Sequence, residues 1–345
     1  CDEEFFNLTN GKYGLDAKYL LCNGPFHVSK WTEKTSVKLA KNNEYNGESS
    51  VSPSSVTFYI NNDDSEVADK MNSVTYDVAF LSSSQFSSIE NKKDLNSVAV
   101  QNVTYSFIFN QNDNNYRNKN MRLAFCRSCD TSSLFDSQSD ISKADGIVPP
   151  SCKIGGEDYR NGNAAELLSY DETLAKKNFN DALLELGSSS VETTILCTEQ
   201  YEPFVKQMVQ KLQKTLGVKF VSTVKVVSES DLEAAVNDGN YSVAFYPFKA
   251  KSSFAGEIIE VFDQNNIFGY ESDVLSQKIR NIKNNSGSLE GERSAVADAE
   301  NYLVSEAVIM PVFYENSYFV TSKKTSGIYF YSSADNVCFI NAKKS

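Results

Sequence analysis

Two cysteines separated by two residues are the first candidates for chemistry in this chain. Cys126-Arg-Ser-Cys129 has the spacing of redox pairs and of zinc sites. A zinc site needs a second such pair or histidines, and His27 is the only histidine. A redox pair would open a helix after a strand, whereas this pair follows the apolar stretch Met121 to Phe125, which predicts a helix. We therefore expect buried thiols or a local disulfide, with Cys152 as a further partner.

The other motifs that could support catalysis are absent or weak. Seven cysteines are an odd number, which excludes a complete disulfide framework within one chain. His27 stands between two apolar residues of a predicted strand, where a structural imidazole is the usual role. The chain has no G-x-S-x-G, Walker or G-x-G-x-x-G motif. The sequence therefore predicts no enzyme, no bound metal and no cofactor.

Composition narrows the class of protein further. A chain of 345 residues favours two lobes over a single core. Its net charge of −12 argues against nucleic acid and against an anionic membrane surface, because both need a basic face. No apolar run reaches the length of a membrane-spanning helix. These features favour a secreted or surface-tethered protein.

The first hundred residues predict short strands and one helix. Alternating residues in Phe26 to Trp31 and in Ser36 to Ala40 predict a hairpin. A third strand at Val56 to Ile60, a helix from Ser65 and a buried strand at Tyr76 to Leu81 would form a β-α-β unit.

The middle of the chain changes character after two further strands, at Val98 to Val103 and Tyr105 to Phe109. The almost wholly polar Asn110 to Asn120 predicts an exposed connection or a crossover between lobes. Helices and strands then alternate, which is typical of an α/β lobe, with Gly187 expected as a helix C-cap and Ser230 as an N-cap. The predicted helices are Met121–Cys129, Asp171–Leu186, Pro203–Leu216, Ser230–Asn237 and Ser294–Leu303, and the predicted strands are Thr193–Cys197, Val218–Val227, Ser242–Tyr246, Ala307–Tyr314, Tyr318–Val320, Gly327–Tyr331 and Val337–Ile340.

Several segments, taken in order, resemble the large solute-binding proteins of oligopeptide and dipeptide ABC transporters. Each motif alone is weak, but their order along the chain is specific to that family. The segments are Asn23-Gly24-Pro25-Phe26 with Trp31, Met121-Arg122-Leu123-Ala124-Phe125 with Asp130, Gly146-Ile147-Val148-Pro149-Pro150, Tyr170-Asp171 with Leu183, and Ala307 to Tyr314.

The resemblance implies a fold and a division of the chain. It implies an α/β fold of the two-lobed periplasmic-binding-protein type, with mixed sheets and flanking helices. The first lobe would comprise residues 1–112 and 321–345, and the second 113–320, with a hinge near 110–115 and 316–322. The family's N-terminal part has no counterpart here, so we expect the first lobe to be incomplete and Cys1 to lie inside a longer protein.

The resemblance also implies ligand-binding positions. Peptide binders commonly carry a G-W-x-A-D-Y motif whose acidic residue meets the peptide amino terminus. Here Phe248 replaces the tryptophan, and Lys251 stands where the aspartate is expected. A lysine would repel an ammonium group and favour a carboxylate or another anion. The expected ligand-binding residues are Tyr246, Phe248 and Lys251, followed by Tyr105, Asn110, Tyr314 and Asn316; core packing is the alternative for Tyr105 and Tyr314, and a solvated loop for Lys251.

The implied function is the substrate-binding component of an ABC importer, which captures oligopeptides or a related small solute by hinge closure. Its partners would be that solute and the transporter permease, and we expect a monomer, no nucleic acid, and an extracytoplasmic location at the cell surface with a lipid anchor in the full-length protein. One alternative is a sensor or docking protein of the same fold. Another is a hydrolase with Cys126 or Cys129 as nucleophile, which would need His27 nearby.

Overall fold

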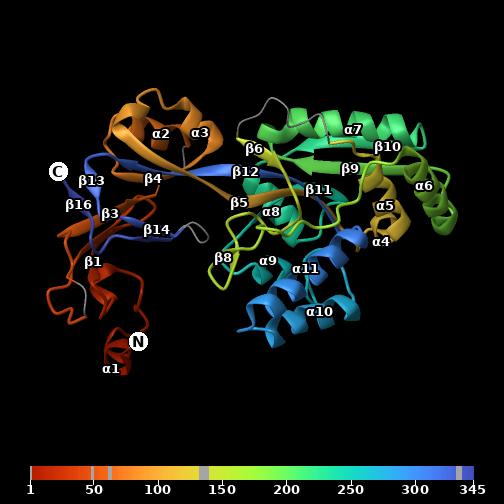
Figure 1. Ribbon diagram of the computed structural model, residues 1–345. Coiled ribbons are helices and arrows are strands. Elements are labelled where there is room, and N and C mark those ends of the chain that lie inside the picture. Colours follow the sequence, from red (N-terminus) through yellow and green to blue (C-terminus); the bar gives the residue numbers. More distant parts are fainter. Residues whose placement is uncertain (1, 48–49, 61–63, 132–139, 332–335) are drawn as a thin grey trace. The chain divides into compact units, whose positions relative to one another are not determined.

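The chain divides into two compact units in the computed structural model, which describes residues 2–47, 50–60, 64–131, 140–331 and 336–345 (Figure 1). Unit 1 comprises residues 1–100 and 317–345, and unit 2 comprises residues 101–316. Strands β5 (Leu95–Phe109) and β12 (Ile309–Ser322) each begin in one unit and end in the other. The lobe boundaries expected at residues 112 and 320 stay a prediction.

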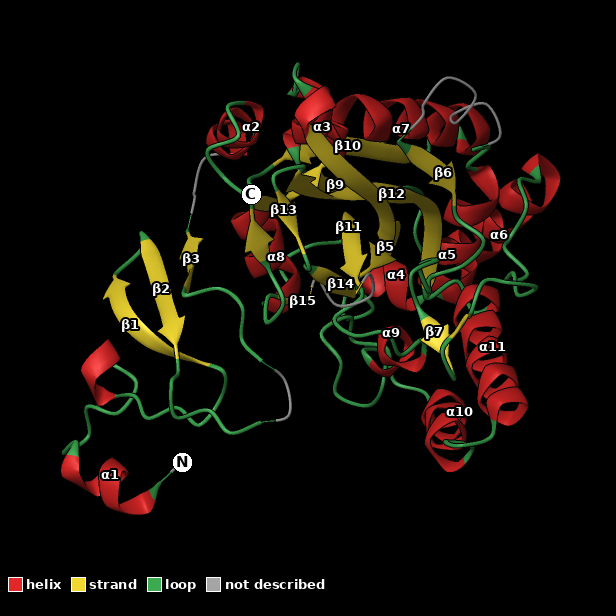
Figure 2. Ribbon diagram, turned by 60° about the vertical axis from the view of Figure 1, so that its left-hand side comes forward, coloured by secondary structure: helices red, strands yellow, loops and turns green. Residues whose placement is uncertain are grey.

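Unit 1 contains a small antiparallel sheet of β1 (Phe26–Thr32), β2 (Ser36–Lys41) and β3 (Ser55–Tyr59), shown in Figure 2. The register of β1 with β2 places Val28 opposite Leu39, so apolar side chains meet on one face. The predicted hairpin is confirmed.

The predicted β-α-β unit is wrong. The helix α2 (Asp64–Asn72) and the strand β4 (Val78–Ser82) both form, but β4 pairs antiparallel with the end of β12, whereas β3 pairs with β2. The partner of β4 lies more than two hundred residues later in the chain, and local periodicity carries no signal for so distant a pairing. The core of this part is formed by Ala68, Met71, Ala79, Leu81, Ile89, Leu95 and Val320.

The remaining elements of unit 1 are short. The predicted strands at residues 327–331 and 337–340 correspond to β14 and β15, which pair with each other. The short elements are α1 (Glu3–Leu8), α3 (Ser83–Ser88), β13 (Thr325–Ser326), β14 (Tyr329–Tyr331), β15 (Asn336–Cys338), β16 (Lys343–Lys344) and the 3-10 turns Ala17–Tyr19 and Lys92–Asp94.

Unit 2 is built on a mixed sheet with the strand order β10-β9-β11-β5-β12, and β6 pairs with β12. Strands β9, β10 and β11 are parallel, while β5 runs antiparallel to β11 and β6 antiparallel to β12. The bounds are β6 (Ile141–Lys143), β9 (Val191–Cys197), β10 (Phe220–Val226) and β11 (Val243–Lys249), with a separate short hairpin of β7 (Lys153–Ile154) and β8 (Glu157–Asp158).

Helices cover both faces of this sheet, as Figure 1 shows. Side chains alternate between the faces, so that Phe107, Phe109 and Phe245 lie in one core while Ile108 and Ala244 lie in the other. The resulting three layers confirm the predicted α/β class. The first layer contains α5 (Lys119–Ser128), α6 (Glu172–Leu186) and α7 (Glu202–Leu216), and the second contains α8 (Glu229–Asn237), α9 (Gly256–Glu260), α10 (Asp273–Asn284) and α11 (Leu289–Ser305).

Helix ends follow local capping rules. Gly187 ends α6 in the left-handed conformation, with φ of 63°, as predicted. The N-cap of α8 is Ser228, whose hydroxyl accepts from the Asp231 N–H, and the expected Ser230 lies inside the first turn instead. Both serines precede the same apolar run, so the sequence alone left the helix start uncertain by two residues.

The polar segment 110–120 differs most from its prediction. Asn110 and Tyr116 are buried, and residues 114–117 form the short helix α4 (Asn114–Arg117). The Tyr116 ring stacks on Phe109, and its hydroxyl lies 2.8 Å from the Thr193 hydroxyl. The segment is therefore ordered rather than an exposed connection, because its amide side chains satisfy backbone groups that regular structure would otherwise pair.

Two strands are longer than expected, and α10 (Asp273–Asn284) is the longest of the described helices that were not predicted. Residues 98–109 form the single strand β5, and residues 309–322 form the single strand β12. Helix α10 is amphipathic, with Leu275, Ile279 and Ile282 buried, but many polar residues surround that stripe. Among the described residues, no helix is both long enough and apolar enough to cross a membrane.

Candidate functional site

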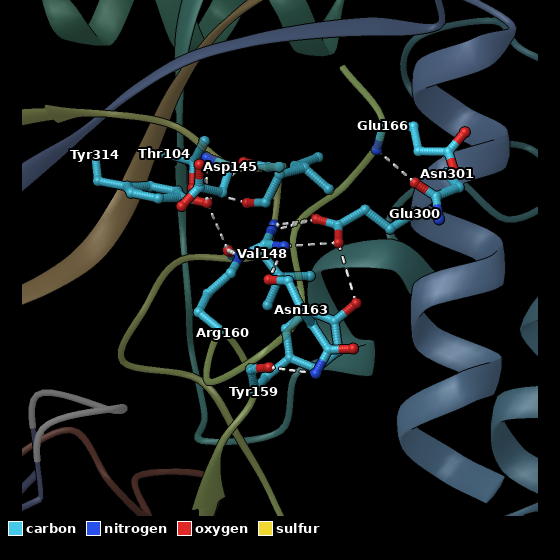
Figure 3. Close-up of polar contacts among 12 residues, drawn as sticks. Thr104, Asp145, Val148, Tyr159, Arg160, Asn163, Glu166, Glu300, Asn301 and Tyr314 are labelled. Carbon is cyan, nitrogen blue, oxygen red and sulfur yellow. Dashed lines mark hydrogen bonds and ion pairs between the residues drawn. The ribbon is translucent and has the colours of Figure 1, made fainter. Parts of the chain in front are cut away.

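The loop of residues 144–165 is fixed to helix α11 by an ion pair between Arg160 and Glu300 (Figure 3). One pair of atoms, Arg160 Nη1 and Glu300 Oε2, is 2.9 Å apart, and Nη2 contacts Oε1. The two side chains are only 8% and 1% exposed. Burial disfavours the charged guanidinium, but the adjacent carboxylate outweighs that effect and raises the pKa of Arg160 above its ordinary value.

The Glu300 carboxylate is saturated by further donors. The Tyr159 hydroxyl donates to Oε2 at 3.0 Å, and the Val148 N–H donates to Oε1 at 2.9 Å. Arg160 Nε in turn donates to the Val148 carbonyl at 2.7 Å. A buried ion pair is stable only when its remaining hydrogen-bonding capacity is used, and these bonds use it. They hold the Gly-x-x-Pro-Pro segment found by resemblance, residues 146–150, against α11.

Gly146 is required by the ion pair. A Cβ at this position would lie 2.3 Å from both Arg160 Nη2 and Glu300 Oε1. A side chain at this position would displace the ends of the two paired side chains, because real Cβ atoms do not approach other atoms so closely. The glycine of the motif is thus explained by close packing against a charged pair.

Tyr314 holds the same loop from the sheet side. Its hydroxyl accepts from the Asp145 N–H at 3.0 Å and lies 3.2 and 3.3 Å from the carbonyl oxygens of Gly146 and Val148. The residue is 2% exposed, and burial raises the pKa of its phenol. Within unit 2 it positions the loop, which agrees with the core-packing alternative for this residue.

Strand β5 supports the loop through its first residues in unit 2. The Thr104 hydroxyl donates to the Ile147 carbonyl at 2.7 Å, and the Ser151 N–H donates to the Gln101 carbonyl at 3.0 Å. Because both bonds join the loop to one strand, residues 147–151 keep a fixed register along β5.

The loop that follows β11 lies against the same region. The Ala250 N–H donates to the Asn102 carbonyl at 2.9 Å, and the Lys153 N–H donates to the Ser253 carbonyl at 2.6 Å. Lys251 lies between these two hydrogen-bonded positions, and it is exposed. The backbone on either side of Lys251 is therefore held while its side chain faces solvent.

Tyr246 and Phe248 point to one face of the sheet but differ in accessibility. Phe248 is 5% exposed and stacks on Phe262 with ring centroids 5.6 Å apart. Tyr246 is half-buried, its ring lies 5.5 Å from that of Phe248, and burial together with Glu233 raises the pKa of its phenol. Phe248 thus belongs to the core of unit 2, and Tyr246 lies at its margin.

Tyr105 lies on the opposite face, in an aromatic cluster with a carboxylate at its edge. Its ring is 4.4 Å from that of Tyr201, whose hydroxyl donates to Glu315 Oε2 at 2.8 Å. Burial raises the pKa of Glu315, with Asp140 and Glu229 adding to the effect, while hydrogen bonds from Tyr201 and Tyr105 oppose it. The carboxylate is therefore easier to protonate than an exposed glutamate.

The two asparagines have structural contacts. Asn110 Nδ2 donates to the carbonyl oxygens of Gly239 and Tyr241, at 2.9 and 2.7 Å, and its Oδ1 accepts from the Asn112 N–H. Asn316 is half-buried, and its N–H donates to the Asp140 carbonyl at 2.8 Å.

The structure does not gather all seven expected residues at one place. Tyr246 and Phe248 share a face that Tyr105 does not, and Asn110 follows the far end of the β5–β11 pair. Lys249 pairs with Val103, seven residues from Asn110, which corresponds to about 23 Å along a strand. Of the seven expected ligand-binding residues, Tyr246 and Lys251 are the ones that lie near the Lys249 end of strand β11 and are not buried.

The cysteine pair has the surroundings of inert thiols. Cys126 and Cys129 are buried and free, and Cys152 is also buried and free. Burial raises the pKa of Cys126 to about 12 and that of Cys129 well above its ordinary value. The expectation of buried thiols is confirmed, while no disulfide joins the described cysteines; Cys1 lies outside the described residues. His27 is exposed and belongs to unit 1.

The Arg160–Glu300 pair was missed by sequence reasoning, although a signal existed. Buried positions of α11 recur at Val296, Ala299, Glu300, Leu303 and Val304, which is the spacing of one helix face. A glutamate on that apolar stripe predicts a buried charge and hence a partner.

The described residues contain no group of three or more His, Cys, Asp or Glu side chains that could hold a metal ion.

Comparison with known proteins adds to this geometry. The family model of bacterial extracellular solute-binding proteins, family 5 (middle), matches residues 5–267. The chain belongs to this family. Its members are solute-binding proteins rather than enzymes, and the resemblance found in the sequence is confirmed.

Individual known proteins are similar to this chain at low identity. The dipeptide-binding protein DppE of Bacillus subtilis (strain 168) is 23% identical over 327 residues, which cover 92% of this chain and 60% of DppE. A substrate-binding domain of an oligopeptide ABC transporter from Bacillus anthracis str. Ames (18% identity) and Listeria monocytogenes OppA bound to peptide (20% identity) each superpose with a TM-score of 0.73, covering 100% of this chain and 69% of theirs. The chain thus spans about 60% of the length of the curated relative, and these structures establish the fold.

Proposed function

We propose that this protein is the substrate-binding component of an ABC importer and captures oligopeptides or a related small solute. The observation that carries the proposal is the family match over residues 5–267, on a fold shared with OppA bound to peptide. Two crossing strands, β5 and β12, join the two units, and closure about such strands is the usual way in which ligand capture is signalled.

The ligand contacts that we propose begin with Lys251 and Tyr246. Lys251 is exposed on a loop whose flanks are hydrogen-bonded to β5 and to Lys153, so its ammonium group can meet a ligand without reordering the backbone. Its charge favours a carboxylate or another anion over a peptide amino terminus. Phe248, Tyr105, Asn110, Tyr314 and Asn316 remain proposed at lower priority, because their environments in unit 2 are largely structural.

The cellular setting follows from the same proposal. We place the protein outside the cytoplasmic membrane, at the cell surface, with a lipid anchor in the full-length protein and the transporter permease as partner. The protein would act as a monomer without catalysis. A sensor of the same fold is the second candidate, and it is favoured by Lys251 at a position where peptide binders commonly carry an aspartate.

Native mass spectrometry of the purified chain tests the proposal. Denaturation should release a bound peptide or a small organic acid that the intact complex retained. A folded chain that stays empty, and that does not gain thermal stability from a peptide library, would contradict solute capture.

The charge of Lys251 can be tested separately. Lys251→Asp should tighten binding of peptides with a free amino terminus by on the order of tenfold. Lys219→Asp is a matched control, because Lys219 is also an exposed lysine of unit 2, just before the start of β10. Equal affinities for the two variants would remove Lys251 from the site.

A further inference from the structure

A cavity of about 360 Å³ lies in unit 2, apart from Lys251 and Tyr246. Its walls come from the end of α5, strand β6, residues 167–170, the end of α11 and the start of β12. Many of the lining side chains are apolar, including Leu168, Val304 and Val312. Nothing in the proposed peptide capture uses this space.

Three sulfur-containing residues line this cavity, and they come from two parts of the chain. Cys126 lies in the last turn of α5, Cys129 is the C-cap of that helix, and both residues line the cavity. Met310, on β12, lines the same cavity and belongs to the same core. All three residues are at most 9% exposed.

We propose that this sulfur cavity binds a soft monovalent cation, of which Cu(I) is the physiological example, through the thiolates of Cys126 and Cys129 and the thioether of Met310. Thiolate and thioether ligands select Cu(I) over hard cations. Zinc is disfavoured because structural zinc takes four ligands, and the described residues offer no group of three His, Cys, Asp or Glu side chains for a metal.

Cations close to the two thiols offset part of the cost of ionising them. Two thiols release their protons to solvent as the metal–sulfur bonds form, and no electron is transferred. Two thiolates and one monovalent cation leave a single negative charge. Burial raises the pKa of both thiols, and nearby cations oppose that effect: Arg122 and Arg127 at Cys126, and Lys211 at Cys129. Among the described residues that line the cavity, Lys143 is a further cation and Asp130 is the only carboxylate.

The experiment is an anaerobic competition for Cu(I) between the reduced full chain and a chromogenic chelator. Cys1, Cys22 and Cys338 are replaced by Ser beforehand, because the last two are not buried and the first is not described. One equivalent of Cu(I) should be retained, with only sulfur neighbours in its X-ray absorption spectrum. The Cys126→Ser, Cys129→Ser and Met310→Leu variants should each lower the affinity at least tenfold.

Matched controls separate this site from non-specific thiol binding and from misfolding. Cys152→Ser and Cys197→Ser remove buried thiols that do not line the cavity, and they should leave the affinity unchanged. Met310→Leu conserves volume, so it should retain the fold while losing the ligand. Failure of the parent chain to retain Cu(I), or equal retention by Met310→Leu and by the control variants, would overturn the inference. Peptide binding is not involved in either result.

Discussion

Replacing Glu300 by Gln should destabilise unit 2 by about 3–5 kcal/mol, the range for breaking a buried ion pair by removing one partner. The partners are 8% and 1% exposed, so the smaller range of about 0–1 kcal/mol for surface pairs does not apply. Gln is nearly isosteric and can still accept from the Val148 N–H, but it leaves the Arg160 guanidinium buried without a counter-charge. For a unit of roughly 200 residues this corresponds to a fall in Tm of about 6–20 °C.

Urea denaturation, monitored by far-UV circular dichroism, measures the loss of unfolding free energy. A double-mutant cycle tests the cause of that loss. Arg160→Met in the Glu300→Gln background removes the unpaired charge, so the double variant should be more stable than the sum of the two single losses predicts, by about 1–3 kcal/mol. A loss below 1 kcal/mol for Glu300→Gln, or strict additivity of the two changes, would refute the reasoning.

Three further predictions follow from the described contacts. Gly146→Ala should destabilise unit 2 by an amount comparable to Glu300→Gln, because its Cβ would overlap the ion pair, whereas Gly24→Ala, with no atom within 4 Å of its added Cβ, should be nearly neutral in the same urea titration. Iodoacetamide should label Cys22 and Cys338 in the native protein and spare Cys126 and Cys129, as peptide mapping would show; rapid labelling of the latter pair would revive the hydrolase alternative. The pKa of Glu315 is raised in the folded state, so its contribution to stability is greatest below the ordinary glutamate pKa and is lost as pH rises through the raised value; the stability of the native chain relative to Glu315→Gln should therefore fall as pH rises above the ordinary glutamate pKa, and a pH-independent difference would contradict it.

The sequence predicted those parts of the fold that local periodicity encodes. Helices α6 and α7 each carry a full apolar face and end at a C-cap glycine, and they form within a residue or two of the expected bounds. Segment 110–120 was misjudged because its amides are satisfied by particular carbonyl groups far along the chain, such as those of Gly239 and Tyr241. Composition cannot show such partners.

The resemblance supplied the candidate ligand-binding residues, and the structure adds the surroundings of each. Lys251 was proposed from a motif, and the residue is exposed. The role of Tyr314 depends on three backbone groups of a loop some 168 residues earlier, and pairing over that distance leaves no periodic signal. Phe248 lies four residues after Ala244 on β11, so the two side chains point to the same face of the sheet and belong to the same core. Only the register of β11 with β5 defines which face that is.

The division of unit 1 between the two ends of the chain has a consequence for synthesis. Strand β4 pairs with residues 317–321 of β12, so on the ribosome it waits for roughly 235 further residues, or about 12–47 s at 5–20 residues per second. Unit 2 is continuous, and all of its elements except β12 are synthesised during that interval. Until β12 is complete, β4 lacks this neighbour and presents an unpaired edge, which is the form most open to wrong association. We therefore expect chaperone dependence during translation to centre on residues 78–82 rather than on the larger unit.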